Sequence, residues 1–251
     1  MTVKFTSSKT DLHSGIFGWV APSSAYELTK ILWNIYDADG LIAIPGRYDD
    51  VLPITDKQRE NNLKVRFDIE EIKKFSEIKD IRTPKGYDPV TTNGLLPTIQ
   101  ISWLNSWYTW DGYKNIIPYQ ATAKINFRLA PWQNAVKMID IFKSWIISKT
   151  PSYIWVEIAN SDPYNAIMLN TDNEITKLAS QTISDIYNKT AVMRYCGAAV
   201  PVSGMFQNML GHQVLIVDLG NEDCNMHWVD ENFDLVCVER WLEFSKRFLS
   251  K

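Results

Sequence analysis

Two of the three histidines in this sequence stand where an imidazole could act on a substrate or a metal ion. His13 stands two residues before the first of two glycines, Gly15 and Gly18, so its ring is expected on a turn, either capping backbone or reaching a ligand. His227 stands in a loop, residues 220–231, among acids and amides after an apolar run. His212 follows a glycine at a predicted helix end, where an imidazole interacts favourably with the helix dipole. His13 and His227 are therefore the candidates for chemistry.

Thiol and carboxylate groups add little to these candidates. The cysteines are widely spaced, without a Cys-x-x-Cys pair, which favours a reduced, cytoplasmic setting. Cys224 and His227 have two residues between them, a spacing that by itself predicts only a weak, accidental metal site. Glu70–Glu71 lies in a charged segment that is predicted to be a solvated helix face.

Composition excludes two classes of protein. The net charge is −3 and no cluster of lysine and arginine occurs, which argues against nucleic acid as a partner. No apolar run is long enough to cross a bilayer, and the first residues lack the apolar core of a signal peptide. A cytoplasmic protein is therefore expected.

Residues 1–160 are predicted to form an antiparallel sheet with two helices on one face, a ferredoxin-like α+β arrangement. Ser24 with Glu27 predicts a capping box for the first helix. Alternation of apolar and polar residues in the third strand places Arg128 on the polar face of the sheet. Residues 81–94, rich in proline and glycine, are predicted to be a loop. The predicted strands are 3–8, 98–103, 121–129 and 153–158, and the predicted helices are 24–39 and 131–146.

From about residue 164 the pattern changes to that of a partial α/β domain. Thr171 with Glu174 predicts a helix start. A continuous apolar run at 214–217 is typical of a buried parallel strand, and the His227 loop follows its carboxyl end, where sites of α/β sheets occur. The other predicted elements are a short strand at 191–195 and helices at 201–211 and 234–251. We therefore expect two domains, 1–163 and 164–251.

Six sequence motifs occur in an order that resembles the co-catalytic zinc metallopeptidases, the family of carnosinase-type dipeptidases, aminoacylases and succinyl-diaminopimelate desuccinylase. The resemblance covers nearly the whole chain. The motifs are Asp11-Leu12-His13-Ser14-Gly15 with Phe17-Gly18, Ile44 to Val51 (IPGRYDDV), Asn115-Ile116-Ile117-Pro118, Phe127 to Pro131 (FRLAP), Gly197 to Pro201 (GAAVP), and the loop from His227 to Glu231.

The resemblance implies a lid (dimerisation) domain at 1–163 followed by the C-terminal part of a catalytic domain that holds two zinc ions. It implies that His13 acts in catalysis by stabilising an oxyanion in the partner subunit's active site. Asn115, Arg128 and Gly197 would bind substrate, Arg128 through the substrate carboxylate. His227 would be a zinc ligand. The substrate would be a peptide or an acyl-amino acid.

The chain also departs from this family. The family's His-x-Asp motif, a further aspartate and a Glu-Glu pair are absent, because none of the three histidines begins a His-x-Asp motif and Glu70–Glu71 falls inside the lid. Ala199 stands where relatives often carry serine, which puts one substrate contact in doubt.

Three hypotheses follow from these departures. The chain is a C-terminal fragment of a zinc peptidase, expected to hold no zinc and to be inactive alone, or a non-catalytic dimerisation or binding module. Alternatively, it is one half of a split enzyme whose N-terminal half is a separate chain. In each case we expect a homodimer through the lid, to which Tyr26, Trp33 and Tyr36, on or beside the first helix, would contribute.

Overall fold

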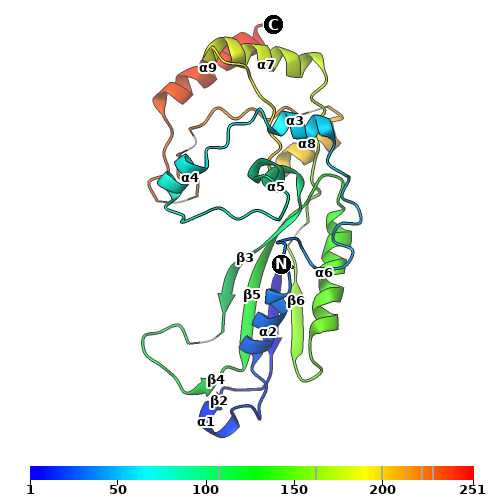
Figure 1. Ribbon diagram of the computed structural model, residues 1–251, viewed down its shortest axis with the longest axis vertical. Helices are drawn as coiled ribbons and strands as arrows, with labels where there is room; N and C mark the ends of the chain where they lie inside the picture. Colours follow the sequence, from blue (N-terminus) through cyan, green and yellow to red (C-terminus); the bar gives the residue numbers. More distant parts are fainter. Residues whose placement is uncertain (107, 162, 199, 213, 222, 228) are drawn as a thin grey trace. The chain divides into compact units, whose positions relative to one another are not determined.

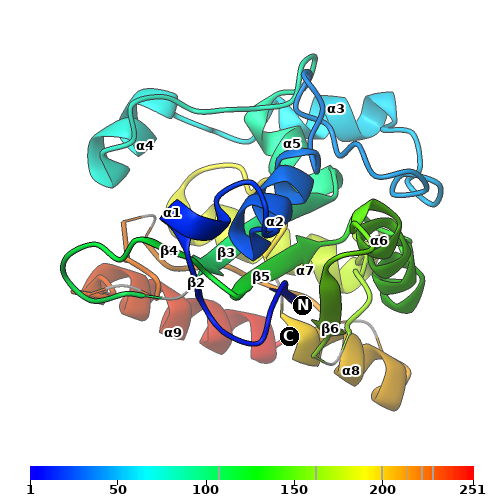
Figure 2. The ribbon, with the colours of Figure 1, turned by 90° about the horizontal axis from the view of Figure 1, so that it is seen from below.

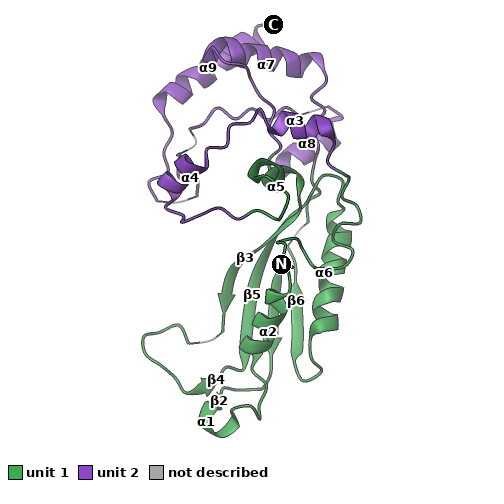
Figure 3. Ribbon diagram, viewed as in Figure 1, with its two compact units in different colours: residues 1–53, 83–166, 196–199 green, residues 54–82, 167–195, 200–251 purple. Residues whose placement is uncertain are grey.

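The computed structural model of this protein describes all but six positions of the chain, namely residues 1–106, 108–161, 163–198, 200–212, 214–221, 223–227 and 229–251. The chain divides into two compact units (Figure 3). Unit 1 comprises Met1–Pro53, Thr83–Ala166 and Cys196–Ala199, and unit 2 comprises Ile54–Arg82, Ile167–Tyr195 and Val200–Lys251. The predicted domain boundary between residues 163 and 164 stays a prediction.

Unit 1 is built on a four-stranded antiparallel sheet. In space the strand order is β3-β5-β1-β6, the order of a ferredoxin-like fold, so the predicted antiparallel sheet is confirmed. Helices α2 and α6 cover one face of it (Figures 1 and 2). These elements are β1 (Thr2–Thr6), β3 (Thr98–Asn105), β5 (Gln120–Arg128), β6 (Trp155–Ala159), α2 (Ser24–Trp33) and α6 (Ala135–Lys149).

The core of unit 1 lies between this sheet face and the two helices. In β5 the buried residues alternate with polar ones as predicted, because successive side chains of a strand point to opposite faces. Phe127 packs edge-on against Phe142 of α6, with ring centroids 4.8 Å apart. The buried residues of this core include Val3, Phe5, Leu28, Ile31, Ile99, Ala121, Ala123, Ile125, Phe142 and Ile146.

The start of α2 differs from the prediction by one residue. Ser23, in extended conformation, is the N-cap, and its hydroxyl accepts a hydrogen bond from the Tyr26 amide. Ser24 is fully buried instead, and its hydroxyl donates to the Tyr119 carbonyl at 2.9 Å. The predicted Ser24–Glu27 capping box is therefore wrong, because two adjacent serines compete for one cap and tertiary contacts decide between them.

A short helix, α5 (Pro89–Leu95), forms inside the segment that was predicted to be a loop. Asp88 caps it by accepting a hydrogen bond from the Thr91 amide at 2.9 Å. Pro89 occupies the first turn, where its missing N–H is no loss. The proline and glycine content that suggested a loop is compatible with one short, well-capped helix.

Helices are the only regular elements among the described residues of unit 2. Its elements are α3 (Asp56–Asn62), α4 (Ile69–Ser76), α7 (Glu174–Tyr187), α8 (Pro201–Leu210) and α9 (Leu235–Leu249). Helix α7 packs against α9 around Ala179, Leu219 and Phe244. Asn173, and not Thr171, caps α7 through the Thr176 amide at 2.8 Å.

The two strands predicted in unit 2, at 191–195 and 214–217, are not formed among the residues that the structure describes. Ile216 and Val192 have 48% and 46% of their surface exposed. A buried parallel strand needs a hydrogen-bonding neighbour on each side, and the described part of unit 2 provides none. No helix within the described chain has the length and hydropathy needed to span a membrane.

Candidate functional site

A two-stranded ladder brings His13 and Asn115 together. Strand β2 (Leu12–His13) pairs antiparallel with β4 (Ile116–Ile117), with His13 opposite Ile116. The Ser14 amide donates to the Asn115 carbonyl at 2.9 Å. The structure therefore places side by side two predicted site residues that lie far apart in the sequence, at one end of unit 1 (Figure 1).

His13 is the N-cap of the single-turn helix α1 (Ser14–Phe17). Its Nδ1 accepts a hydrogen bond from the Gly15 amide at 3.0 Å. A Cβ at residue 15 would lie 3.0 Å from His13 Cε1, so glycine keeps room for the ring. Because Nδ1 accepts, the hydrogen of the neutral ring is assigned to Nε2, which becomes a donor on an exposed side chain. Capping and donation are therefore compatible roles for His13.

Arg128 ends strand β5 opposite Thr98 and is half-buried on the polar face of the sheet, as predicted. No carboxylate of the described residues lies within ion-pair distance of its guanidinium. Arg128 thus forms no surface ion pair within the part of the chain that the structure describes. The predicted substrate-binding role of Arg128 stays a prediction.

Beside Arg128 the structure reveals a residue that was not predicted, Arg47. Its side chain is 2% exposed, with the guanidinium carbon 5.6 Å from the centre of the Phe127 ring. Its Nη2 donates to the Arg128 carbonyl at 3.4 Å. Burial lowers the pKa of Arg47 to about 10. The sequence carried no signal for this, because an arginine in a Pro-Gly turn is ordinarily exposed.

Gly197 lies against helix α5. Its amide donates to the Asn93 side-chain oxygen at 3.4 Å. A Cβ on residue 197 would lie 2.4 Å from the Asn93 carbonyl oxygen, so a larger residue would displace backbone. This close contact is a sufficient reason for glycine at position 197, whether or not a substrate binds there. The predicted substrate-binding role of Gly197 stays a prediction.

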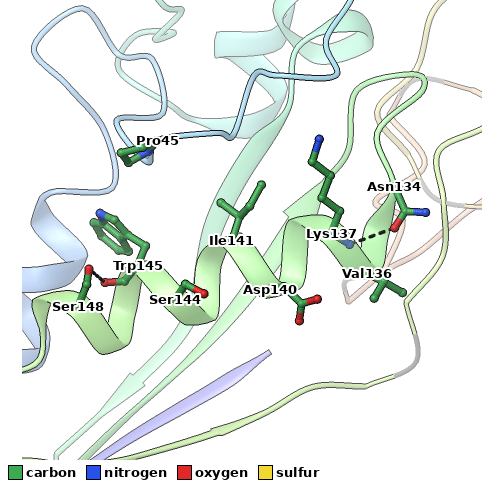
Figure 4. Close-up of a pocket in the computed structure, with 9 residues that line it drawn as sticks. All are labelled: Pro45, Asn134, Val136, Lys137, Asp140, Ile141, Ser144, Trp145 and Ser148. Atoms are coloured by element: carbon green, nitrogen blue, oxygen red, sulfur yellow. Dashed lines mark hydrogen bonds between the residues drawn. The ribbon is translucent and has the colours of Figure 1, made fainter.

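The groove in Figure 4 is a separate feature of unit 1, with a volume of about 790 Å³. It runs along α6 below Pro45 (Figure 4). Lys137, one of its two charged residues, is already paired with Asp50 at 2.8 Å. None of the predicted site residues lines it, so it is not the candidate site. Its lining residues are Pro45, Asn134, Val136, Lys137, Asp140, Ile141, Ser144, Trp145 and Ser148.

A family model described as a peptidase dimerisation domain, M20_dimer, matches residues 1–154, more than half of the chain. The chain belongs to the M20 peptidase dimerisation-domain family.

Curated relatives agree with this M20 assignment. The Cys-Gly metallodipeptidase DUG1 of Candida albicans is 27% identical over 236 residues, which is 90% of this chain and 47% of that protein. The Beta-Ala-His dipeptidase of Homo sapiens is 24% identical over 243 residues, 95% of this chain and 47% of that protein. The M20 chain therefore spans about half the length of these relatives.

Solved structures show the same fold. The di-peptidase Dug1p of Saccharomyces cerevisiae matches 99% of this chain and 52% of its own, with a TM-score of 0.85 at 21% identity. The M20 family metallo-carboxypeptidase Sso-CP2 of Sulfolobus solfataricus covers 99% of this chain and 57% of its own, with a TM-score of 0.81 at 24% identity.

The M20 metallopeptidase family implies bound metal, and His227 is the ligand predicted from this chain. His227 is exposed, with a φ of +67°. Among the described residues, no three histidine, cysteine, aspartate or glutamate side chains gather closely enough to hold a metal ion. Glu70 and Glu71 stand in the exposed first turn of α4, where Glu70 pairs with Lys73. The described residues therefore do not fit a two-zinc site. Ala199, Glu222 and Trp228 lie outside the described residues.

The dimerisation domain places the predicted site residues His13 and Asn115 far from Arg128. His13 and Asn115 stand near the start of β5, because β4 precedes it by two residues, whereas Arg128 stands at its end. A strand of nine residues spans about 26 Å. The two ends of β5 thus serve one small substrate only if two subunits contribute to the same site.

Proposed function

We propose that this chain is the lid plus C-terminal part of an M20 metallopeptidase that hydrolyses a dipeptide or acyl-amino acid. The observation that carries this is the placement of the exposed His13 imidazole near one end of β5 and of Arg128 at the other end. Arg128 pairs with no carboxylate of the described residues. In a dimer, the donor of one subunit would meet a substrate that the arginine of the other subunit holds.

Each side chain has a task that suits its chemistry. The His13 Nε2–H would donate to the oxyanion that develops at the scissile carbonyl, with Asn115 beside it. Arg128 would bind the substrate carboxylate in a bidentate manner. The relatives named as dipeptidases and carboxypeptidases suggest a substrate with a free C-terminal carboxylate.

The zinc ions and the general base are assigned in this proposal to an N-terminal half that this chain does not contain. His227 is the one zinc ligand proposed from this chain, as the resemblance implies. A cytoplasmic location is part of the same proposal and is supported by the absence of disulfides among the three cysteines.

Self-association through the lid is supported by the family of residues 1–154. We propose the β3 edge of the sheet as the contact surface, together with Tyr26 and Trp33 of α2, which are 57% and 84% exposed. Tyr36 is not part of this surface, because its hydroxyl bonds to the Ile99 backbone inside unit 1.

Complementation tests the proposed activity. The chain is co-expressed with a separate N-terminal half of an M20 dipeptidase, and hydrolysis of Cys-Gly and β-Ala-His is followed. We expect turnover only from the pair. Arg128→Ala should mainly raise KM, because a carboxylate is bound in the ground and transition states alike. His13→Ala should mainly lower kcat, because the oxyanion exists only during reaction.

His212→Ala is the matched control, since His212 is an exposed histidine outside the proposed site. Complementation in which His13→Ala and Arg128→Ala behave like this control would contradict the assigned roles. A stable dimer that no N-terminal half activates would favour the second candidate function, a non-catalytic dimerisation module. The family match over the lid supports this candidate.

A further inference from the structure

Arg47 is a buried cation that no anion of the described chain neutralises. Two of its three guanidinium nitrogens, Nε and Nη1, are buried without a hydrogen-bond partner in the described residues. The third, Nη2, donates to the Arg128 carbonyl at 3.4 Å. The one hydrogen bond of the buried Arg47 guanidinium to the described residues is therefore made to the residue proposed to bind substrate.

The turn that carries Arg47 is tied to the end of β5 by a second buried residue. Gln133 donates from Nε2 to the Arg47 carbonyl at 2.7 Å and accepts from the Ala130 amide at 2.9 Å. The Phe127 ring lies against the Arg47 guanidinium on the core side. Backbone and side chain of Arg47 thus brace residues 127–130 from the core, while the Arg128 side chain occupies the opposite face.

This arrangement is unfavourable for stability alone. Burying a guanidinium without a counter-charge costs its hydration free energy. One long hydrogen bond and one contact with an aromatic ring offset only a small part of that cost. An apolar side chain of similar length would fill the same space without that penalty. The burial of a charged group at this position therefore needs another explanation.

We propose that Arg47 is a positioning residue, which holds the end of β5 so that Arg128 presents its guanidinium to an anionic substrate group in one orientation. This inference rests on the proposed role of Arg128 in carboxylate binding. It adds a buried residue, from a different segment of the chain, on which that binding depends.

Arg47→Met in the full chain tests this inference, with two measurements. Amide hydrogen exchange by NMR should become about fivefold faster at residues 127–130 than at 121–125, the value expected from the loss of one hydrogen bond. The thermal midpoint should stay equal or rise, because a buried charge is removed. A merely structural Arg47 would instead give a lower midpoint and faster exchange along all of β5.

Arg47→Lys keeps the charge but lacks the planar fork, so it should fray residues 127–130 as Arg47→Met does. Exchange rates like those of the wild type in Arg47→Lys would overturn the positioning role. Ile146→Val, which trims the fully buried core elsewhere in unit 1, is the control for a general loss of stability.

A ligand titration separates this inference from the proposed function. N-acetylglycine should shift the Arg128 Nε resonance, and its methylamide, which lacks the carboxylate, should not. Arg128→Met should abolish carboxylate binding, and Arg47→Met should weaken it several-fold. If Arg47→Met frays residues 127–130 but the wild type binds no carboxylate, Arg47 positions the end of β5 and the proposed role of Arg128 is wrong. If the wild type binds the carboxylate and Arg47→Met binds it equally well, the role of Arg128 stands and the positioning role of Arg47 is wrong.

Discussion

At the scale of single residues, the two ring nitrogens of His13 have different surroundings. Nδ1 accepts from the Gly15 amide within the same turn, whereas Nε2 makes no hydrogen bond to the described residues. A local backbone bond thus selects the tautomer, as a backbone or carboxylate partner commonly does for functional histidines. The backbone of the turn thus leaves the hydrogen on Nε2, and no second side chain is needed to orient it.

We expect His13 to be the Nε2–H tautomer at neutral pH. Long-range ¹H–¹⁵N correlation spectra of the histidine rings distinguish the two nitrogens directly. Gly15→Ala should reduce this preference, because the new Cβ would press against the ring at 3.0 Å. A neutral His13 that carries its hydrogen on Nδ1 would contradict both the cap and the donor role.

At the scale of elements, α5 depends on a titratable cap. Burial by itself would raise the pKa of Asp88, but hydrogen bonds from the Thr91 side chain and backbone outweigh it and lower the pKa below its usual value. A lowered pKa in the folded state means that ionised Asp88 stabilises the helix above the unfolded pKa, and that this stabilisation is lost as pH falls through the folded pKa.

We therefore expect α5 to fray in acid while α7, capped by the neutral Asn173, does not fray at the same pH. Secondary ¹³Cα shifts of 89–95 and 174–187, followed from about pH 6 to about pH 3 across the ordinary aspartate range, measure this. Asp88→Asn keeps a good N-cap and should remove the pH dependence of α5. Equal acid fraying of α5 in Asp88→Asn would show that another group is responsible.

At the scale of the whole molecule, the sheet has two edges of different character. Edge strand β3 exposes Ile101, Trp103 and Leu104 at 44%, 43% and 50%. On the opposite edge, β6 exposes Trp155 but also carries the charged Glu157, which pairs with Lys4 of β1. An apolar edge strand invites pairing with another chain, and charged residues discourage it. The β3 edge is therefore the better candidate for self-association.

Sedimentation at micromolar concentration should give about twice the chain mass of 28.9 kDa. Trp103→Lys should shift the protein to the monomer, because a charge would be buried at the interface. Trp155→Lys is the matched control on β6, where the tryptophan is 67% exposed. A monomeric wild type would contradict self-association. A shift to the monomer caused only by Trp155→Lys would place the interface at the β6 edge.

The chain alone should hold far less than one zinc ion per molecule after chelation, re-addition of zinc and desalting. A catalytic zinc needs about three protein ligands and a two-metal site needs more, whereas the described residues contain no group of three. Metal analysis and a dipeptidase assay measure this. Two retained zinc ions, or turnover that His227→Ala abolishes, would reveal a ligand set that this structure does not show.

Local patterns in the sequence were enough for much of unit 1. The alternation in β5 predicted which face Arg128 occupies, because side-chain direction in a strand follows from its period of two. The order of strands and helices predicted the antiparallel sheet. Motif order also indicated the family that the match over residues 1–154 shows.

Only the tertiary structure decided which groups meet. The choice of Ser23 over Ser24 as the cap, the ladder that joins His13 to Asn115, and the burial of Arg47 beneath Arg128 each depend on a partner from a distant segment. The same reason explains the failure at 214–217, where an apolar run predicted a strand. A strand exists only with hydrogen-bonding neighbours, and periodicity along one segment carries no information about whether another segment supplies them.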